Sequence, residues 1–396
     1  MHKIPLSPKG LMAASVTALC LALPFSIAGT NIALGLVCAG LMWHALSAGR
    51  LPWRRTWGAA ALCLWIYVAV CALTGALGVA PAESLRILPK ELHKIGVFYA
   101  LLLACVCAPE APAAAALVLG FTAVAGYGAA QSVVKSAANG WFWIRASGFM
   151  HPVTYGDMLA LALLGALCFL LRPGQNQPRQ RELLVFLGIG TLAFILNQTR
   201  AAFLALFIGF LTLCAADREL RRWIKWALLA AMLGAVALEL LPTHRSLLGS
   251  LRDFGATVAK PGSNPQLDRL ALWDVAWRAF RDHPVLGVGP GNYRTVFPRY
   301  FSGEIATQRV WGSAHSLYLH QLAERGLLGL AALLALFAAM LARAWQRVRA
   351  LPNAWNLWAL GTMAAFLVMN LTEISFQNEL VATFLIIIWV KAEAQT

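Results

Sequence analysis

Charged residues are scarce in this chain of 396 residues. Asp, Glu, Lys and Arg together make up 12% of it, whereas hydrophobic residues make up 60%. A soluble domain cannot bury that much apolar surface, and repeated apolar runs of about 20 residues are typical of transmembrane helices. The shortage of charge therefore excludes an ordinary soluble domain and indicates an all-α, polytopic integral membrane protein.

Motifs for metal or nucleotide chemistry are also lacking. The sequence has no HExxH, no DxD and no acidic pair at metal-ligand spacing, so we predict no catalytic metal. It has no P-loop, which argues against nucleotide hydrolysis, and we expect no other cofactor. All eight cysteines lie in apolar runs, which excludes a disulfide framework or a cysteine-based zinc site in the polar part of the chain.

About twelve apolar segments are present, and we predict that each spans the membrane as a helix. They cover residues 11–28, 32–48, 57–79, 95–107, 113–133, 155–171, 183–196, 201–215, 223–241, 326–344, 354–369 and 380–390. The first resembles a signal peptide. Because no clean small-x-small cleavage site follows it, we interpret it as an uncleaved span.

One long polar segment interrupts this pattern and divides the chain into three predicted parts. Residues 1–241 hold nine spans, residues 242–325 form a large helical loop, and residues 326–396 hold three more spans. A membrane protein that places so many residues outside the bilayer in one stretch usually keeps its chemistry there.

Basic residues at the span ends indicate the orientation. With the N-terminus inside, four basic clusters fall on the cytoplasmic side, as the positive-inside rule requires. They are Arg50, Arg54 and Arg55; Arg172, Arg179 and Arg181; Arg218, Arg221, Arg222 and Lys225; and Arg343, Arg347 and Arg349. Both termini are then cytoplasmic, and the 242–325 loop faces the periplasm of a bacterium. The net charge of +15 is thus no indication of nucleic acid binding.

Other basic residues fall on the outer side, against the rule. Arg86, Lys90 and Lys94 recur every four residues, so a helix places them on one face, and Pro89 suits the first position of that helix. If such cations converge on a cavity they bind an anion, and phosphate is the usual anion for arginine. The alternative is contact with lipid headgroups.

Two more outer arginines adjoin predicted spans. Arg145 lies in the aromatic segment WFWIRASGFMHPVTYGDML, in which Trp141 and Trp143 suit the membrane interface. Arg200 opens a span after NQT, where a cation opposes the helix dipole by some tenths of a kcal/mol. Either Arg200 has a function that offsets this cost, or it reaches towards headgroups.

Arg269 belongs to a predicted helix over residues 268–282. Helical periodicity places Trp273, Ala276, Trp277 and Phe280 on its apolar side, and Arg269 projects from that side. A buried arginine needs an anionic partner. Asp268, Glu304 or a ligand phosphate could supply it.

His315 lies in WGSAHSLYLHQ, where a helix is predicted to begin with Ser313 as its N-cap. The positive end of a helix dipole favours neutral imidazole, which can accept a proton as a general base near pH 7. The alternative is a core or capping histidine. His320 points to another face and is assigned no role.

Four stretches together resemble the bacterial O-antigen ligases and cover about residues 145–330. They are RASGFMHPVTYGDML, NQTRAAFLAL, DRLALWDVAWRAFRDHPVLGVGPGNY and AHSLYLHQLAERGLLGL. The superfamily also holds O-antigen polymerases and some protein O-oligosaccharyltransferases. The resemblance implies a GT-C-like membrane glycosyltransferase of lipopolysaccharide biosynthesis, with a lipid-facing cavity under the periplasmic loop. It implies undecaprenyl pyrophosphate-linked O-antigen as donor and a lipid A–core hydroxyl as acceptor. Arg200, Arg269 and His315 match the family's functional positions.

The chemistry of this transfer agrees with these residue types. Pyrophosphate is a good leaving group, so positive charge can replace the general acid that glycosidases need. Arg200 and Arg269 would stabilise the developing negative charge, helped by further cations. Those predicted helpers are Arg86, Lys90 and Arg145. His315 would deprotonate the acceptor hydroxyl in a single displacement, which inverts the anomeric carbon.

Three alternatives remain open at the level of sequence. The first is an O-antigen polymerase, whose acceptor is a second lipid-linked repeat. The second is a non-catalytic lipid transporter, which would carry intramembrane charges along a path. The third is a structural membrane scaffold, which would leave Arg269 and His315 without a role.

Overall fold

The computed structural model describes residues 7–48, 50–53, 58–140, 144–174, 177–240, 265–301 and 310–395. Within these ranges the regular structure is helical and no strand occurs, which confirms the all-α prediction. The first helices are α1 Pro8–Ala22, α2 Ile27–Ala48, α3 Ala59–Ala76, α4 Pro81–Cys107, α5 Ala113–Ala138, α6 Pro152–Leu171, α7 Gln180–Asn197, α8 Arg200–Ala216, the 3-10 helix η2 Leu220–Trp223 and α9 Ile224–Leu240. The others are α11 Pro265–Asp282, α12 Tyr293–Tyr300, α13 Leu317–Ala350, α14 Ala354–Met369, the 3-10 helix η3 Ser375–Gln377 and α15 Glu379–Glu393.

The long apolar helices confirm a polytopic membrane protein. By length and composition, six of the described helices can cross a membrane, namely α2, α3, α5, α6, α7 and α13. Three shorter apolar helices, α1, α8 and α14, accompany them. The figure of twelve spans stays a prediction.

Two predicted helix boundaries were wrong. The segment 11–28 is not one span, because Pro24 interrupts the helix and the Ser26 hydroxyl then accepts a hydrogen bond from the Gly29 amide as α2 begins. The helix that carries Arg86 begins at Pro81, and Pro89 lies inside it. The sequence alone does not distinguish a proline at the first position of a helix from one inside the helix, and tertiary packing decides between these two positions.

The apolar side of α11 also differs from the prediction. Its buried residues are Leu272, Val275, Ala276 and Ala279, whereas Trp277 is 48% exposed. The small and branched side chains pack against α12 and α13 to form a second core with Tyr293 and Phe297. The prediction gave most weight to the large aromatic residues, whereas smaller residues fit this narrow interface better.

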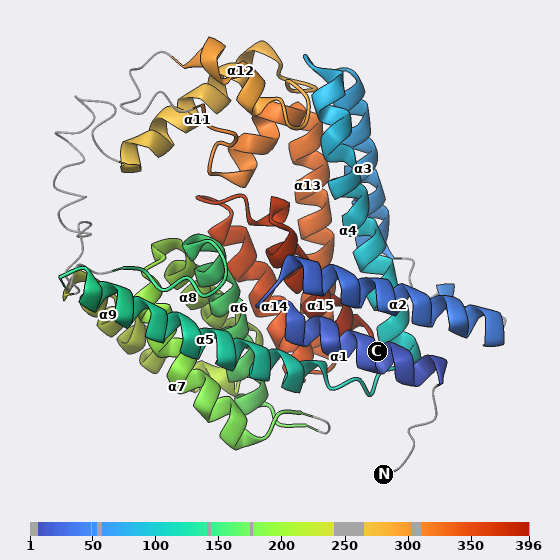
Figure 1. Cartoon of the computed structure of the whole chain (residues 1–396), viewed down its shortest axis with the longest axis vertical. Helices are drawn as coiled ribbons and strands as arrows, with labels where there is room; N and C mark the ends of the chain where they lie inside the picture. The colour runs from blue at the N-terminus through green and yellow to red at the C-terminus, as the bar shows by residue number, and fades with distance from the viewer. Residues whose placement is uncertain are drawn as a thin grey trace.

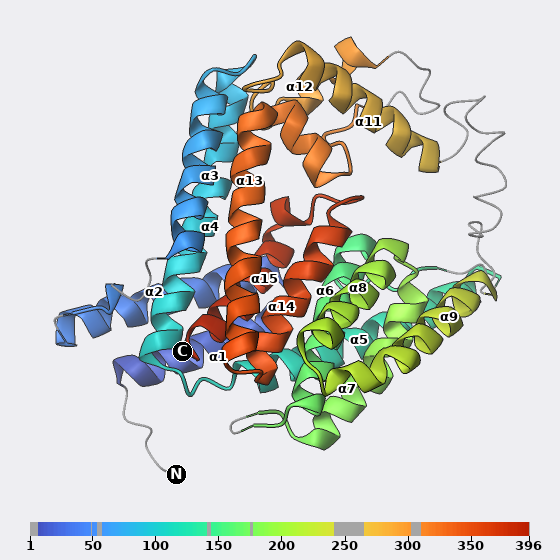
Figure 2. The same cartoon turned by 180° about the vertical axis from the view of Figure 1, so that it is seen from behind.

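The helices form an upright group and a cap. In Figures 1 and 2, α3, α4 and α13 stand side by side, and α11 and α12 lie across their upper ends. We call α11, α12 and residues 310–325 the cap. The helices α5 to α9 form a separate group on the other side of α14, which packs on both α8 and α13.

A glycine break in α13 fastens the cap. Gly326 has φ 61°, and the amides of Leu327 and Leu328 donate to the carbonyls of Pro284 (2.9 Å) and Val285 (3.3 Å). A Cβ atom on Gly326 would lie 2.3 Å from the Val285 oxygen. The HPVLGVGPGN segment therefore fits into the break only because the residue at 326 lacks a side chain.

A buried arginine next to this break joins the cap to the spans. The Arg325 guanidinium is fully buried and contacts Glu91 and Glu324, each at 3.0 Å, and the Cys71 sulfur at 3.1 Å. Removing one partner of such a group leaves a buried charge uncompensated, which typically costs about 3–5 kcal/mol. The cap is thus held at a fixed angle on α3 and α4.

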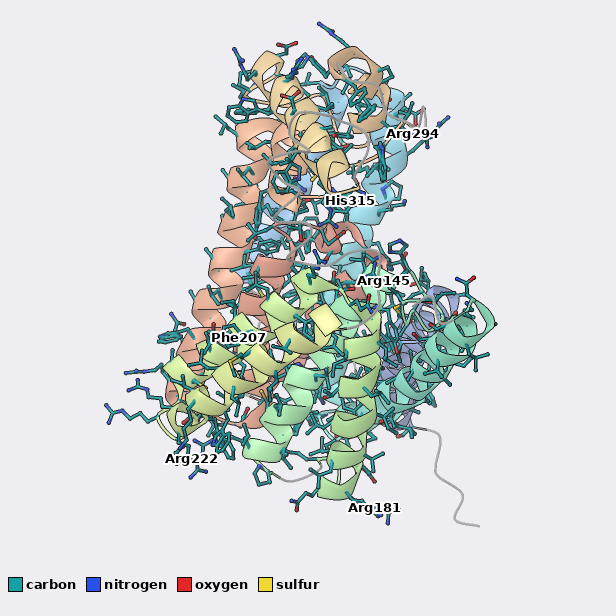
Figure 3. The ribbon with its side chains drawn as sticks, turned by 90° about the vertical axis from the view of Figure 1, so that its left-hand side faces the viewer. Arg145, Arg181, Phe207, Arg222, Arg294 and His315 are labelled. Carbon is teal, nitrogen blue, oxygen red and sulfur yellow. The ribbon has the colours of Figure 1, made fainter. Side chains whose placement is uncertain are left out.

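Basic residues of the predicted cytoplasmic clusters lie far from the cap. Figure 3 shows Arg181 and Arg222 at the end of the molecule opposite His315 and Arg294. Arg172, from the same predicted cluster as Arg181, forms ion pairs with Asp217 (2.6 Å) and Glu219 (2.7 Å). This separation agrees with the predicted orientation, which stays a prediction.

Candidate functional site

His315 lies directly before α13 rather than inside its first turn. The helix begins at Leu317 with Ser316 at the N-cap, so the prediction of Ser313 as N-cap was wrong. His315 has φ 47°, a left-handed conformation that few residues other than glycine adopt. Two residues further on, the Leu317 N–H donates to the carbonyls of Asn370 (3.0 Å) and Glu373 (2.9 Å), which ties this segment to the loop after α14.

Glu373 brings the two predicted residues of the long loop together. Nη2 of Arg269 lies 2.5 Å from Oε1 of Glu373, and Nδ1 of His315 lies 3.5 Å from Oε2. The carboxylate side chain is 10% exposed, compared with 37% for Arg269 and 30% for His315. A nearly buried anion is thus shared by two more accessible groups.

The contact with His315 is electrostatic rather than a hydrogen bond. A separation of 3.5 Å is too long for an N–H···O bond, and Nδ1 is buried without a hydrogen-bond partner among the described residues. The Trp311 ring packs edge-on against the imidazole, with centroids 5.5 Å apart. A small movement of Glu373 would complete the bond.

The loop that carries Glu373 is held firmly. The Ser375 hydroxyl donates to Oδ2 of Asp157 at 2.7 Å, and the Phe376 ring is buried against Tyr67, Phe337 and Phe366. Arg269 and Glu373 lie close enough to Asp157 to interact with it electrostatically. The carboxylate is therefore positioned by the spans, while Arg269 and His315 come from the cap.

Arg145 binds the corner between α7 and α8, directly before Arg200. Arg145 donates to the Asn197 carbonyl (2.7 Å) and to the Thr199 hydroxyl (2.6 Å), and Arg200 is the first residue of α8. A Cβ on Gly156 would lie 2.3 Å from Oδ1 of Asn197, so this corner packs against the residue next to Asp157. Figure 3 shows Arg145 and His315 at the level where the spans meet the cap.

Arg86, Lys90 and Lys94, which were predicted to share one face of α4, do not form one binding set. Arg86 pairs with Glu83 at 2.8 Å and its side chain is 74% exposed, whereas Lys94 is buried against Glu91 at 2.5 Å. Lys90 is exposed and lines a separate groove. In the described part of the chain, Arg86 and Lys90 make no ion pair with Glu373.

Several predictions concern residues that lie outside this description. They are Trp141, Trp143 and Glu304, together with the side chain of Asp268. Glu373 was missed as the partner of Arg269, since it lies 104 residues away. Its only sequence signal is an isolated acid, LTEISF, between two apolar segments.

No set of metal ligands is assembled within the described ranges. Groups of three or more His, Cys, Asp or Glu side chains close enough to hold an ion do not occur there. The residues that do come together are Arg269 and His315, on the carboxylate of Glu373. The predicted independence from metal stays a prediction.

A comparison with known protein families finds one match that includes three of these residues. Residues 183–334 match the family model described as O-antigen ligase. The match includes Arg200, Arg269 and His315 but ends before Glu373, and no curated protein matches the chain. The family supports an activity of the O-antigen ligase or polymerase type. Over residues 183–334 the chain is therefore similar to the O-antigen ligase family.

Proposed function

We propose that the protein is an O-antigen ligase of the bacterial inner membrane. It would transfer polysaccharide from undecaprenyl pyrophosphate to a hydroxyl of the lipid A–core oligosaccharide at the periplasmic face. The predicted loop 242–325 would form the periplasmic part, with spans 1–241 and 326–396 on either side and both termini in the cytoplasm. The observation that carries the proposal is the meeting of Arg269 and His315 on the carboxylate of Glu373.

The donor diphosphate would bind to cations from both parts of the molecule. Arg269 reaches it from the cap, and Arg145 and Arg200 from the α7–α8 corner. Guanidinium groups suit this task because each can donate two parallel hydrogen bonds to phosphate oxygens. Charge that develops on the leaving diphosphate is then stabilised without a general acid. Arg86 and Lys90 were also predicted for this set, but we leave them out of the proposed arrangement, because Arg86 pairs with Glu83 and Lys90 lines a separate groove.

The acceptor hydroxyl would lose its proton to His315. With Nδ1–H directed at Glu373, Nε2 carries the free lone pair and accepts the proton as the hydroxyl oxygen attacks C1 of the donor sugar. The bond between C1 and the phosphate oxygen breaks, and its electron pair leaves with the diphosphate. Glu373 then stabilises the imidazolium, as a carboxylate does in catalytic triads.

Glu373 would couple donor binding to this proton transfer. Arg269 forms a short ion pair with the carboxylate, and a diphosphate competes for the same guanidinium. When Arg269 turns to the diphosphate, Glu373 loses its closest cation and can approach Nδ1 of His315. Catalytic hydrogen bonds are often long before substrate binds, which agrees with the 3.5 Å separation.

A reconstituted assay tests the proposal against its rivals. Purified protein in lipid nanodiscs receives a lipid-linked polysaccharide and either lipid A–core or a lipid-linked repeat unit as acceptor. The ligase forms product with lipid A–core, and the new bond has the anomeric configuration opposite to that of the donor. Extension of the lipid-linked repeat alone would identify a polymerase. Absence of any new glycosidic bond would favour a transporter or scaffold.

A further inference from the structure

A groove on another face of the spans has the form of a lipid site. It has a volume of about 250 Å³ and lies between α4 and α15, with Asn31 of α2 at its side. Its lining includes Gln377, four residues after Glu373, but none of Arg145, Arg200, Arg269, His315 or Glu373. The groove is therefore distinct from the site where the cap meets the spans.

Both long walls of the groove change from polar to apolar in the same direction. On α4 the lining begins with Pro89 and Lys90, continues with His93 and Lys94 and ends with Val97. On α15 it begins with Glu379, continues through Thr383 and ends with Ile386. Residues three or four apart share a helix face, so each helix presents one continuous stripe. A polar headgroup fits one end of these stripes and a hydrocarbon chain the other.

Lys90 is the cation available at the polar end. Lys94 is bound to Glu91 at 2.5 Å, and Arg86 is bound to Glu83 at 2.8 Å. Lys90 is exposed and forms no ion pair within the described residues. An ammonium group at the polar end of a groove whose other end is apolar attracts an anion, and the usual anion of a membrane lipid is a phosphate.

Glu379 and Asn31 provide polar contacts for parts of a headgroup other than its phosphate. Oε1 of Glu379 accepts a hydrogen bond from the Asn31 amide at 2.6 Å, which fixes the carboxylate beside the groove. A carboxylate there repels a second negative charge but accepts hydrogen bonds from a hydroxyl or ammonium group. The groove thus suits a headgroup that combines a phosphate with hydrogen-bond donors.

We propose that this groove binds the phosphate-bearing headgroup of a membrane lipid. Lys90 contacts the phosphate, Glu379 and Asn31 contact neighbouring donors, and an acyl or prenyl chain lies along Val97 and Ile386. Three sources share this chemistry, namely a polyprenyl diphosphate, a phosphorylated glycolipid and a bulk glycerophospholipid. Binding goes beyond the proposed function, because it requires no glycosyl transfer.

Lipid binding to purified protein tests the site. The probes are a short-chain polyprenyl diphosphate, a lipid A with two phosphates, and phosphatidylglycerol, each titrated into detergent-solubilised protein. Lys90→Glu is compared with the wild type and with Lys135→Glu, an exposed lysine in the last turn of α5. Lys90→Met, which removes the charge while keeping the stem, is included in case the reversed charge disturbs the fold.

We expect Lys90→Glu to weaken at least one probe about tenfold or more, and Lys90→Met to weaken the same probe less. Lys135→Glu should bind all probes as the wild type does. The affected probe identifies the source of the phosphate. If both Lys90 variants fold and bind all three probes as tightly as the wild type, the proposal is wrong. That result would not bear on the proposed transfer reaction, since this experiment measures lipid binding and involves no acceptor.

Discussion

Arg269 and Glu373 lie 104 residues apart and join the cap to the loop between α14 and α15 through an ion pair of 2.5 Å. The carboxylate is the more buried member, and Asp157 is close enough to interact with it. Glu373 therefore depends on Arg269 for compensation of its charge. The same dependence makes the carboxylate responsive to any anion that draws Arg269 away.

Glu373→Gln should separate donor binding from transfer. The amide keeps the shape but cannot stabilise imidazolium, so we expect the transfer rate to fall about a hundredfold. Donor affinity should stay the same or increase, because no carboxylate competes for Arg269. Turnover and donor affinity of the purified variant are measured in parallel. Asp274→Asn, an exposed acid on α11, serves as control. A normal rate with Gln at 373 would remove the carboxylate from the mechanism.

His315→Ala should abolish transfer and spare donor binding. Loss of a general base typically slows a reaction about 10²–10⁴-fold, whereas the diphosphate contacts come from the arginines. The rate is followed with lipid A–core as acceptor. His283→Ala, at the end of α11, is the matched control. His320 is unsuitable because it is 2% exposed and lies 3.3 Å from Glu324, so its removal disturbs the cap. Retention of full activity by His315→Ala would rule out its role as base.

Arg269→Lys should rescue Arg269→Ala poorly. Lysine provides a point charge but not the planar pair of donors that fits phosphate oxygens. Loss of charged hydrogen bonds worth about 1.5–3 kcal/mol predicts a decrease in donor affinity of roughly 10–100-fold in both variants. Arg278→Lys is the control on the same helix, since that arginine pairs with Asp274 at 2.8 Å. Wild-type donor affinity in Arg269→Lys would show that charge alone is sufficient there.

Arg145→Ala should lower stability as well as activity. The guanidinium holds the α7–α8 corner through the Asn197 carbonyl and the Thr199 hydroxyl. We expect the free energy of unfolding to decrease by about 1.5–3 kcal/mol. Thermal unfolding in detergent measures the change, and Lys135→Ala, at an exposed lysine in the last turn of α5, should leave the melting temperature unchanged. An unchanged melting temperature with lost donor affinity would instead assign Arg145 to the ligand alone.

Chelation should leave the transfer rate unchanged. The proposed mechanism places arginine side chains where a divalent cation would otherwise neutralise the diphosphate. The rate is compared before and after dialysis against EDTA, and again after adding Mg²⁺ or Mn²⁺. A rate that disappears with the chelator and returns with the metal would contradict the prediction.

The glycines of HPVLGVGPGN predict the shape of their own loop but not the segment against which it packs. Their presence indicates a tight loop, and Gly287 indeed has φ 66°. The sequence alone does not reveal that this loop enters the break at Gly326 in α13, because that fit depends on the backbone of another segment. For the same reason the prediction of Ser313 as N-cap was wrong, since the start of α13 is fixed by the loop after α14.

The sequence by itself determined the helical membrane architecture, because hydropathy and helical periodicity are local properties that survive in any packing. It also marked Arg145, Arg200, Arg269 and His315 as cations or bases in unusual places. Only the tertiary structure decided their partners. Glu373 meets Arg269 and His315, and Lys90 faces a groove of its own, because packing brings distant segments together and short-range polar contacts form only after that.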